Sequence, residues 1–343
     1  MQKEIIIDCR LLDKRKNTGI SRYTEFLIDY YLARYKNSEI LLISNNNINI
    51  NNIDCIVTKL RPFNLLHFFI FPFFISKLNV AILHSPFYSS LSFKIHPIKT
   101  IVTVHDLMYK MVPNFFSNNR LLNLLGKIYY SIIVNFSLNN ADIILSDSLS
   151  TRNDLLIKFK INSIVIPLNS ELPFLPDHNV LNRNNLEFKK YFFYCGSARL
   201  HKNIDFIRNF FEDNQNLPIL VLAGPNHSPS TNRVKVLGLV NDSELNALYQ
   251  GCIAFIFPSL YEGFGLPILE AYRSGCHVIA SKIPAFLEFS DAPIFYFELD
   301  HSDDLLKAIE GAMNSEDPCV QNFLDSYSNS KLYNLLDHAT ISP

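Results

Sequence analysis

Short apolar runs alternate with longer stretches of helical periodicity along the first half of the chain. The short runs have the length of buried strands, and apolar side chains that recur every three to four residues indicate helices. Strands that alternate with helices predict a parallel sheet covered by helices on both faces. The expected strands are residues 5–7, 39–43, 80–84, 101–105 and 142–146, and the expected helices are residues 19–35 and 118–136.

The same alternation starts again near residue 191. Between the halves, residues 168–188 contain prolines and many asparagines without periodicity, which is typical of a linker. We therefore expect two α/β domains in tandem, with a ligand in the cleft beyond the carboxyl ends of their strands. The expected strands of the second domain are residues 191–195, 219–223, 234–236, 254–257, 277–280 and 294–297, and its expected helices are 204–212, 243–250, 267–274 and 303–313.

The composition is that of a globular protein, with 48% hydrophobic and 18% charged residues. The six cysteines include no C-x-x-C pair, so we interpret them as reduced core thiols rather than as a disulfide framework or a zinc site. The first residues lack the long apolar segment of a signal peptide. Together these features predict a cytoplasmic protein.

The net charge of −1 conceals two oppositely charged halves. Residues 1–170 carry 19 Lys/Arg and 11 Asp/Glu, a balance of +8, and residues 171–343 carry 12 and 21, a balance of −9. The first half is therefore expected to face a bilayer surface, a phosphate-bearing acceptor or nucleic acid, unless the two surfaces are simply solvated. The apolar stretch 65–75 is too short to span a bilayer and is interpreted as a buried helix or strand, or as a surface-inserting element.

Several common motifs are missing from the sequence. The chain contains no G-x-G-x-x-G dinucleotide fingerprint, no P-loop and no G-x-S-x-G nucleophile elbow. No two aspartates stand two positions apart, so no D-x-D pair could hold a metal on a diphosphate. We therefore expect neither a metal site nor a cofactor.

The most informative segment is residues 258–276, PSLYEGFGLPILEAYRSGC. An apolar strand leads into a glycine-rich loop, and Pro267 fits the first turn of the helix that follows, with Gly275 just beyond its end. Backbone N–H groups at such a junction favour an anion. Glu262 precedes the helix and Glu270 lies within it, so the two carboxylates are expected to accept hydrogen bonds from different groups of one ligand.

This E-x7-E spacing resembles the signature of family 4 of the retaining glycosyltransferases, which have the GT-B fold of two facing, doubly wound Rossmann-like domains. The resemblance implies that Glu262 contacts the donor sugar and Glu270 the nucleotide ribose. Residues 193–203, FYCGSARLHKN, are similar to the family's glycine loop, which implies that Lys202 neutralises the donor diphosphate. The implied donor-binding residues are Gly19, Ser197, Arg199, Lys202, Val240, Glu262, Gly263, Phe264, Gly265, Leu266 and Glu270.

In the first half, residues 7–23 resemble the family's first strand and glycine loop, which places Gly19 near the donor phosphate. His105, in TVHDL, matches a histidine that lies near the reacting sugar, and Ser148 is a candidate cleft residue. The implied catalytic residues are His105, Glu262 and Lys202. The implied domains are residues 1–170 on the acceptor side, 186–322 on the donor side, and a last helix at 323–343 that crosses back to the first domain.

The resemblance implies transfer of a hexosyl group with retention and without a metal. It points to bacterial O-antigen or surface-polysaccharide synthesis, with GDP-mannose as the favoured donor and a lipid-linked saccharide as the acceptor. Nucleic acid is then not an expected partner, and the cytoplasmic enzyme would contact the inner membrane peripherally. The alternatives are a UDP-, dTDP- or other GDP-sugar with a soluble acceptor, and a non-catalytic carbohydrate-binding module of the same fold.

Overall fold

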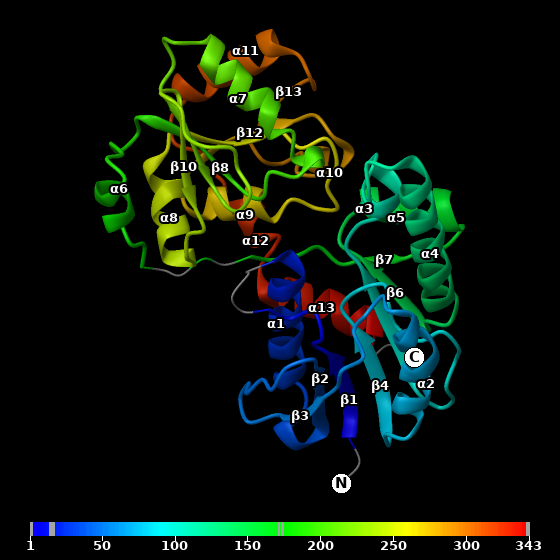
Figure 1. The fold of residues 1–343 in the computed structure, drawn as a ribbon. Helices are drawn as coiled ribbons and strands as arrows, with labels where there is room; N and C mark the ends of the chain where they lie inside the picture. Colours follow the sequence, from blue (N-terminus) through cyan, green and yellow to red (C-terminus); the bar gives the residue numbers. More distant parts are fainter. Residues whose placement is uncertain (1–2, 14–17, 171, 173–174, 341–343) are drawn as a thin grey trace. The chain divides into compact units, whose positions relative to one another are not determined.

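The computed structural model describes residues 3–13, 18–170, 172 and 175–340, which form two compact α/β units. The first unit comprises Met1–Asn169 and Asn329–Pro343, and the second comprises Ser170–Ser328. Each unit contains one parallel sheet between helices (Figure 1). The expected fold class, two doubly wound parallel-sheet domains, is confirmed.

The sheet of the first unit has the strand order β3-β2-β1-β4-β5-β6-β7, and all its pairs are parallel. The order reverses between β1 and β4, so this unit has a topological switch point there. The strands are β1 (Lys3–Asp8), β2 (Ile40–Ser44), β3 (Asp54–Val57), β4 (Val80–Ser85), β5 (Lys99–Val104), β6 (Ile143–Ser146) and β7 (Ile164–Val165).

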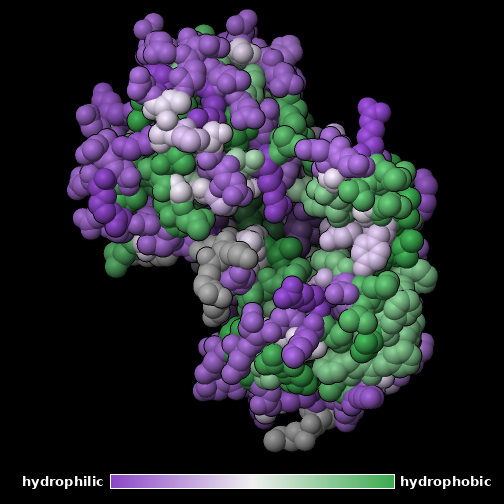
Figure 2. All heavy atoms as spheres, in the orientation of Figure 1, coloured by the Kyte–Doolittle hydropathy of each residue, from purple (hydrophilic) through white to green (hydrophobic). Residues whose placement is uncertain are grey.

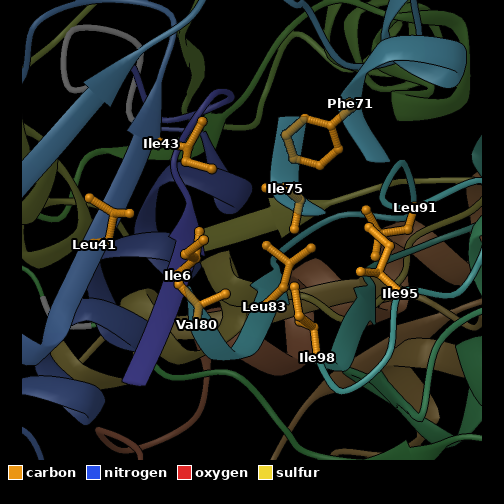
Figure 3. Close-up of a cluster of buried hydrophobic side chains, with 10 residues drawn as sticks. All are labelled: Ile6, Leu41, Ile43, Phe71, Ile75, Val80, Leu83, Leu91, Ile95 and Ile98. Carbon is orange, nitrogen blue, oxygen red and sulfur yellow. The ribbon is translucent and has the colours of Figure 1, made fainter. Parts of the chain in front are cut away.

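Helices cover both faces of this sheet. On one face, Phe71 and Ile75 of helix α2 pack against Ile6 and Leu83 of the central strands (Figure 3). On the opposite face, Tyr31 of α1 donates to or accepts from His84, which follows Leu83 and therefore points the other way. The helices are α1 (Gly19–Leu32), α2 (Leu65–Ser76), α3 (Met108–Met111), α4 (Arg120–Asn139), α5 (Leu149–Phe159) and α13 (Asn329–Thr340).

The last helix of the first unit comes from the far end of the chain. Asp337 of α13 pairs with Arg34, with 2.5 Å between Nη2 and Oδ2, and accepts a hydrogen bond of 2.9 Å from the Tyr30 hydroxyl. At the other end of α13, the Asn169 amide donates to the Asn329 side-chain oxygen at 2.7 Å. Two distant segments of sequence are therefore joined in one unit.

The sheet of the second unit has the strand order β10-β9-β8-β11-β12-β13. Its order reverses between β8 and β11, which places a second switch point at the carboxyl ends of these two strands. The strands are β8 (Tyr191–Cys195), β9 (Ile219–Ala223), β10 (Val234–Gly238), β11 (Ala254–Phe257), β12 (His277–Ser281) and β13 (Phe295–Phe297). The helices are α6 (Asn179–Arg183), α7 (Ile204–Asp213), α8 (Asp242–Gly251), α9 (Leu266–Arg273), α10 (Pro284–Leu287), α11 (Ser302–Met313) and α12 (Gln321–Asp325).

Three expectations need correction. Residues 168–188 are not linker throughout, because α6 buries Val180 and Leu181 within the second unit. The stretch 65–75 is a helix that buries one side and exposes the other, so it is neither a fully buried element nor purely a surface element. The cysteines are all free, but Cys319 is exposed and is not a core thiol.

Candidate functional site

Lys202 lies just beyond the carboxyl end of β8, in the short 3-10 helix Leu200–Lys202. Its Nζ atom is 2.5 Å from Oε1 of Glu262, and the two side chains are 18% and 11% exposed. The Lys202 ammonium also lies 5.4 Å from the centroid of the Phe257 ring. An ammonium has three N–H donors, so the ion pair with Glu262 uses only part of its capacity.

Glu262 lies in the loop that follows β11, the strand next to β8 in the sheet. The Ser259 hydroxyl donates to Oε1 of Glu262 at 2.6 Å. The backbone N–H of Leu260 donates to the carbonyl of His201 at 2.7 Å and so ties this loop to the segment that carries Lys202. The cation and the carboxylate therefore meet at the switch point of the sheet, where ligands of open α/β sheets bind.

The glycine-rich loop continues into α9. Gly265 has φ +136°, a conformation that favours glycine, and a Cβ atom there would lie 3.1 Å from Phe289 and 3.2 Å from Phe286, so both rings would have to shift slightly. The side chains of Phe264 and Leu266 are buried. They pack the loop of Gly263, Phe264, Gly265 and Leu266 against the core.

The start of α9 has the features expected of an anion-binding helix terminus. Pro267 lies in its first turn, as predicted, and Gly275 follows its end with φ +72°. The N-terminal N–H groups of a helix and its dipole favour negative charge. A diphosphate oxygen is a suitable occupant.

Glu270 is buried within α9 and already has partners. Its Oε1 accepts a hydrogen bond of 2.7 Å from the Ser170 hydroxyl, and its Oε2 accepts one of 3.3 Å from Tyr249. A carboxylate offers about four lone-pair sites, so these contacts orient Glu270 without exhausting it. Sequence reasoning did not identify Ser170 or Tyr249 as its partners.

The remaining donor residues of the second unit lie at the carboxyl ends of neighbouring strands. The Ser197 carbonyl accepts from the Tyr194 hydroxyl at 3.2 Å, which leaves the Ser197 side chain outside this contact. Arg199 is exposed, two residues beyond Ser197, and Val240 is partly exposed after β10. Among the predicted residues of this unit, the structure pairs Lys202 with Glu262 directly.

His105 belongs to the first unit and follows β5. Its Nδ1 lies 2.6 Å from Oδ2 of Asp147, and its Nε2 lies 3.0 Å from the Pro86 carbonyl oxygen. Burial alone would lower the pKa of His105, but the Asp147 carboxylate, the Pro86 carbonyl and Asp106 together raise it above its ordinary value. Because both ring nitrogens face acceptors, the imidazolium form, with a donor on each nitrogen, fits this site.

Two further predicted residues of the first unit lie at helix starts. Gly19 is the first residue of α1, whose cap Thr18 accepts a hydrogen bond from the Ser21 N–H. Residues 14–17 of the preceding loop lie outside the described residues. Ser148 is buried and caps α5 by accepting from the Thr151 N–H at 2.9 Å, so its hydroxyl serves the fold.

Asp147 and Ser259 are functional candidates that sequence reasoning missed. Asp147 follows β6, which pairs with the strand that ends before His105, so neighbouring carboxyl ends bring the two side chains together. The pairing of β5 with β6 brings Asp147 to His105, and this pairing cannot be read from the sequence. Ser259 stands three residues before Glu262, at the spacing of a local turn.

Known glycosyltransferases are similar to parts of this chain. Residues 181–323 match the family model described as "Glycosyl transferases group 1". The chain is 27% identical over 226 residues to the O-antigen chain mannosyltransferase RfbU of Salmonella typhimurium, covering 61% of this chain and 59% of RfbU. It is 28% identical over 221 residues to the O-antigen chain mannosyltransferase B of Escherichia coli, covering 55% of each. The matches thus span less than two thirds of these relatives.

Solved structures resemble the chain over nearly its whole length. The sucrose-phosphate synthase of Thermosynechococcus elongatus superposes with a TM-score of 0.71 at 16% identity, covering 98% of this chain and 95% of that one. WaaG, a glycosyltransferase involved in lipopolysaccharide biosynthesis, superposes with a TM-score of 0.66 at 10% identity and the same coverage. Identities this low establish the fold alone, which is GT-B. The chain thus has the GT-B fold, and its residues 181–323 match the group 1 glycosyltransferases.

Proposed function

We propose that the chain is a retaining glycosyltransferase that moves a hexosyl group from a nucleotide diphosphate sugar to a lipid-linked saccharide at the cytoplasmic face of the membrane. The favoured donor is GDP-mannose, and the favoured pathway is synthesis of bacterial O-antigen or another surface polysaccharide. The observation that carries the proposal is the ion pair of Lys202 and Glu262 at the switch point of the second sheet.

The donor diphosphate would bind between Lys202 and the N-terminus of α9. When the bond between the sugar C1 and the diphosphate oxygen breaks, negative charge develops on that oxygen. An ammonium group and a helix N-terminus that are already in place stabilise this charge without reorganisation. Glu262 would then exchange part of its contact with Lys202 for a sugar hydroxyl, and Glu270 would accept from the ribose.

Retention follows in this proposal from reaction on one face of the sugar. The acceptor hydroxyl attacks C1 on the side that the diphosphate leaves, and its proton passes to the departing phosphate oxygen. From the first unit, we propose that His105, held between Asp147 and the Pro86 carbonyl, contributes positive charge near the reacting sugar. The protein then contributes mainly position and electrostatic stabilisation.

The choice of mannose is supported by the relatives, two of which are named O-antigen mannosyltransferases. The test is to incubate the protein with GDP-mannose, other GDP-sugars, UDP-sugars and dTDP-sugars, and to measure slow release of the nucleotide. Release should be fastest from GDP-mannose, and NMR of the transferred product should show the α-anomer of the donor. Faster release from a UDP-sugar would overturn the donor, and an inverted product would overturn retention.

Activity should not depend on a divalent metal. The chain has no D-x-D pair, and Lys202 with the α9 terminus would supply the positive charge that a metal supplies elsewhere. We expect transfer rates in excess EDTA to equal those in magnesium or manganese. Loss of activity in EDTA with recovery on adding manganese would contradict this assignment of the leaving-group chemistry.

A further inference from the structure

Helices α2 and α4 of the first unit turn large apolar side chains toward solvent. The ring centroids of Phe68 in α2 and Phe136 in α4 are 5.3 Å apart, so the two helices adjoin, and their exposed side chains form one surface, which we call the apolar face. In Figure 2, apolar residues gather where Figure 1 shows α4 and α2. The exposed members of the apolar face are Leu65, Leu66, Phe69, Ile70, Phe73, Leu121, Leu122, Leu124, Leu125, Ile128, Ile132 and Phe136.

A surface of this kind requires an occupant. Single exposed leucines are normal, but soluble proteins rarely expose a large contiguous apolar patch unless it binds something. Leu121 of α4 is 64% exposed and Phe73 of α2 is 61% exposed, values typical of surface lysines rather than of core residues. Neither side chain belongs to the buried core of the first unit.

A groove with three lysines lies beside the apolar face. It has a volume of about 580 Å³, and its apolar lining includes Ile128, Ile132 and Phe136 of the apolar face. Lys110, Lys127 and Lys158 also line it, and no acidic side chain does so in the described part of the chain. The groove therefore combines an apolar wall with positive charge, the chemistry of an anionic amphiphile.

The lysines of the groove are held rather than fully mobile. The Lys110 ammonium lies 4.2 Å from the centroid of the Phe159 ring, and Lys127 donates to the Val112 carbonyl at 3.2 Å. Burial, and after it the charge of Lys158, lowers the pKa of Lys110, which shows that the two cations repel each other. An anion in the groove would relieve this repulsion.

The charge around the apolar face is mostly positive. Residues 55–141, which include both helices, contain eight Lys/Arg and a single acidic residue, Asp106. Neither α2 nor α4 contains an acidic residue. A second copy of the chain docked through this face would place cations against cations, whereas an anionic lipid surface would complement them.

The packing of α4 also distinguishes lying on a membrane from crossing it. Of the described helices, α4 alone is long and apolar enough to span a bilayer by length and composition. However, Val134 and Leu138 of α4 belong to the buried core cluster beside β5. A helix that is packed on a sheet along one side and apolar along the other suits the interface plane of a bilayer.

We propose that the apolar face docks on an anionic lipid bilayer, with α2 and α4 in the headgroup region and lipid phosphates bound by Lys110, Lys127 and Lys158. The proposal deepens the proposed function and rests on it in one respect, the membrane-borne acceptor. The exposed residues of α2 and α4 and the lysines of the groove identify the surface that would meet the membrane. A soluble acceptor would leave the apolar face without a role.

The test is flotation of the full chain with vesicles. Wild type should float with vesicles that contain phosphatidylglycerol, should lose binding as salt rises, and should not float with pure phosphatidylcholine. The triple variant Lys110→Gln/Lys127→Gln/Lys158→Gln should bind on the order of 100-fold more weakly, at about fivefold for each lysine near the surface. The matched control Lys36→Gln/Lys190→Gln/Lys331→Gln, which changes three exposed lysines elsewhere, should bind like wild type.

The apolar contribution needs a separate variant. Leu121→Asn/Leu125→Asn should weaken binding by about tenfold or more, since two leucines lose the burial that insertion gives them. The control Leu175→Asn/Leu287→Asn changes two exposed leucines outside the apolar face and should have no effect. All four altered leucines are exposed, so circular dichroism melting should confirm that both variants fold.

Three outcomes would overturn the proposal. The first is equal binding to neutral and anionic vesicles, and the second is equal binding of face variants and their controls. The third is a dimer in sedimentation velocity that dissociates in Leu121→Asn/Leu125→Asn, which would make a second copy the occupant. Nucleotide release from GDP-mannose in detergent solution is measured alongside, so vesicle binding without release would refute the proposed function and leave the docking surface intact.

Discussion

Lys202 and Glu262 neutralise each other as long as no donor is bound. Their 2.5 Å contact holds a cation and a carboxylate together, and in the proposed function each takes a separate task when the nucleotide sugar binds. Removing one partner therefore has two consequences: a ligand contact is lost, and the other side chain is left with an unbalanced charge. Ser259 limits the second consequence for Glu262, because its hydroxyl still donates to the carboxylate.

We expect Lys202→Ala and Glu262→Ala each to reduce kcat/KM by ~10²-fold or more, the scale of one lost electrostatic contact in the transition state. Steady-state kinetics with saturating acceptor would measure this. The matched control is Lys282→Ala, which breaks an exposed ion pair with Glu298 in the same unit and should leave kcat/KM unchanged. Wild-type rates in both site variants, with folding verified, would refute the site.

Lys202, Glu262 and Glu270 can be proposed as site residues from the sequence, because each lies in a local motif whose residue types suit a nucleotide-sugar donor. The sequence was insufficient for Asp147, which is separated from His105 by 42 residues and meets it only through strand pairing. The contacts that orient Glu270 were invisible for the same reason. The candidate ligand residues lie in local patterns, whereas the partners that orient them depend on tertiary structure.

At the scale of elements, the attachment of α2 to the sheet depends on a buried polar network. Arg10 pairs with Asp8 at 2.6 Å, and both side chains are fully buried after β1. The Arg10 guanidinium also donates to Nδ1 of His67 in α2 at 2.9 Å, and His67 donates from Nε2 to the Ser90 carbonyl. His67 must be neutral to accept from Arg10, so its charge state affects how α2 is held.

This network predicts a loss of stability in acid. Burial, and after it the Arg10 charge, lowers the pKa of His67 to about 3. Since the unfolded state takes up a proton near pH 6.5 and the folded state does not, the contribution of His67 is complete above pH 6.5 and is lost as pH falls toward 3. Between these limits His67→Gln should lessen the slope of unfolding free energy against pH by about 1.4 kcal/mol per unit.

Urea unfolding followed by circular dichroism at several pH values measures this slope. Above pH 7.5 neither state of His67 carries a proton, so the free energies of wild type and His67→Gln should there differ by a constant amount. If the variant kept the wild-type slope between pH 4 and 6, His67 would not be the group that titrates.

The elements that sequence reasoning found and missed differ in burial and length. Strand β11 was predicted with its correct bounds, since all four residues are apolar and buried. Strand β3, at the edge of the first sheet, has exposed ends and no buried residue, so no pattern marks it. Helices α6 and α12 have five residues each, too few to show a period.

At the scale of the whole molecule, the first unit is discontinuous in sequence. The chain leaves it at Asn169 and re-enters it at Asn329, and the side chains of these two residues are hydrogen-bonded at 2.7 Å. The intervening segment, residues 170–328, thus leaves and re-enters the first unit at one place. Because Asn169 and Asn329 are in contact, a short linker could join them at a small cost in conformational entropy.

This arrangement predicts that the first unit folds without the second. A variant in which residues 170–328 are replaced by a short Gly/Ser linker should melt cooperatively and keep the Arg34–Asp337 contact. Heteronuclear NMR spectra would show whether the amide signals are dispersed. A matched variant that ends at Asn169 without α13 should be less stable, because Tyr30 and Arg34 lose their partners. Equal stability of the two variants would contradict the role assigned to α13.

The same connection affects the order in which a ribosome can complete the protein. Translation delivers residues 3–169 first, but the helix that covers α1 emerges only after all of the second unit has been made. The second unit is contiguous, so it can finish folding while the first still lacks α13. Nascent chains would then expose the α13-binding side of α1, including Tyr30, until α13 emerges, which reverses the usual rule that the N-terminal domain matures first.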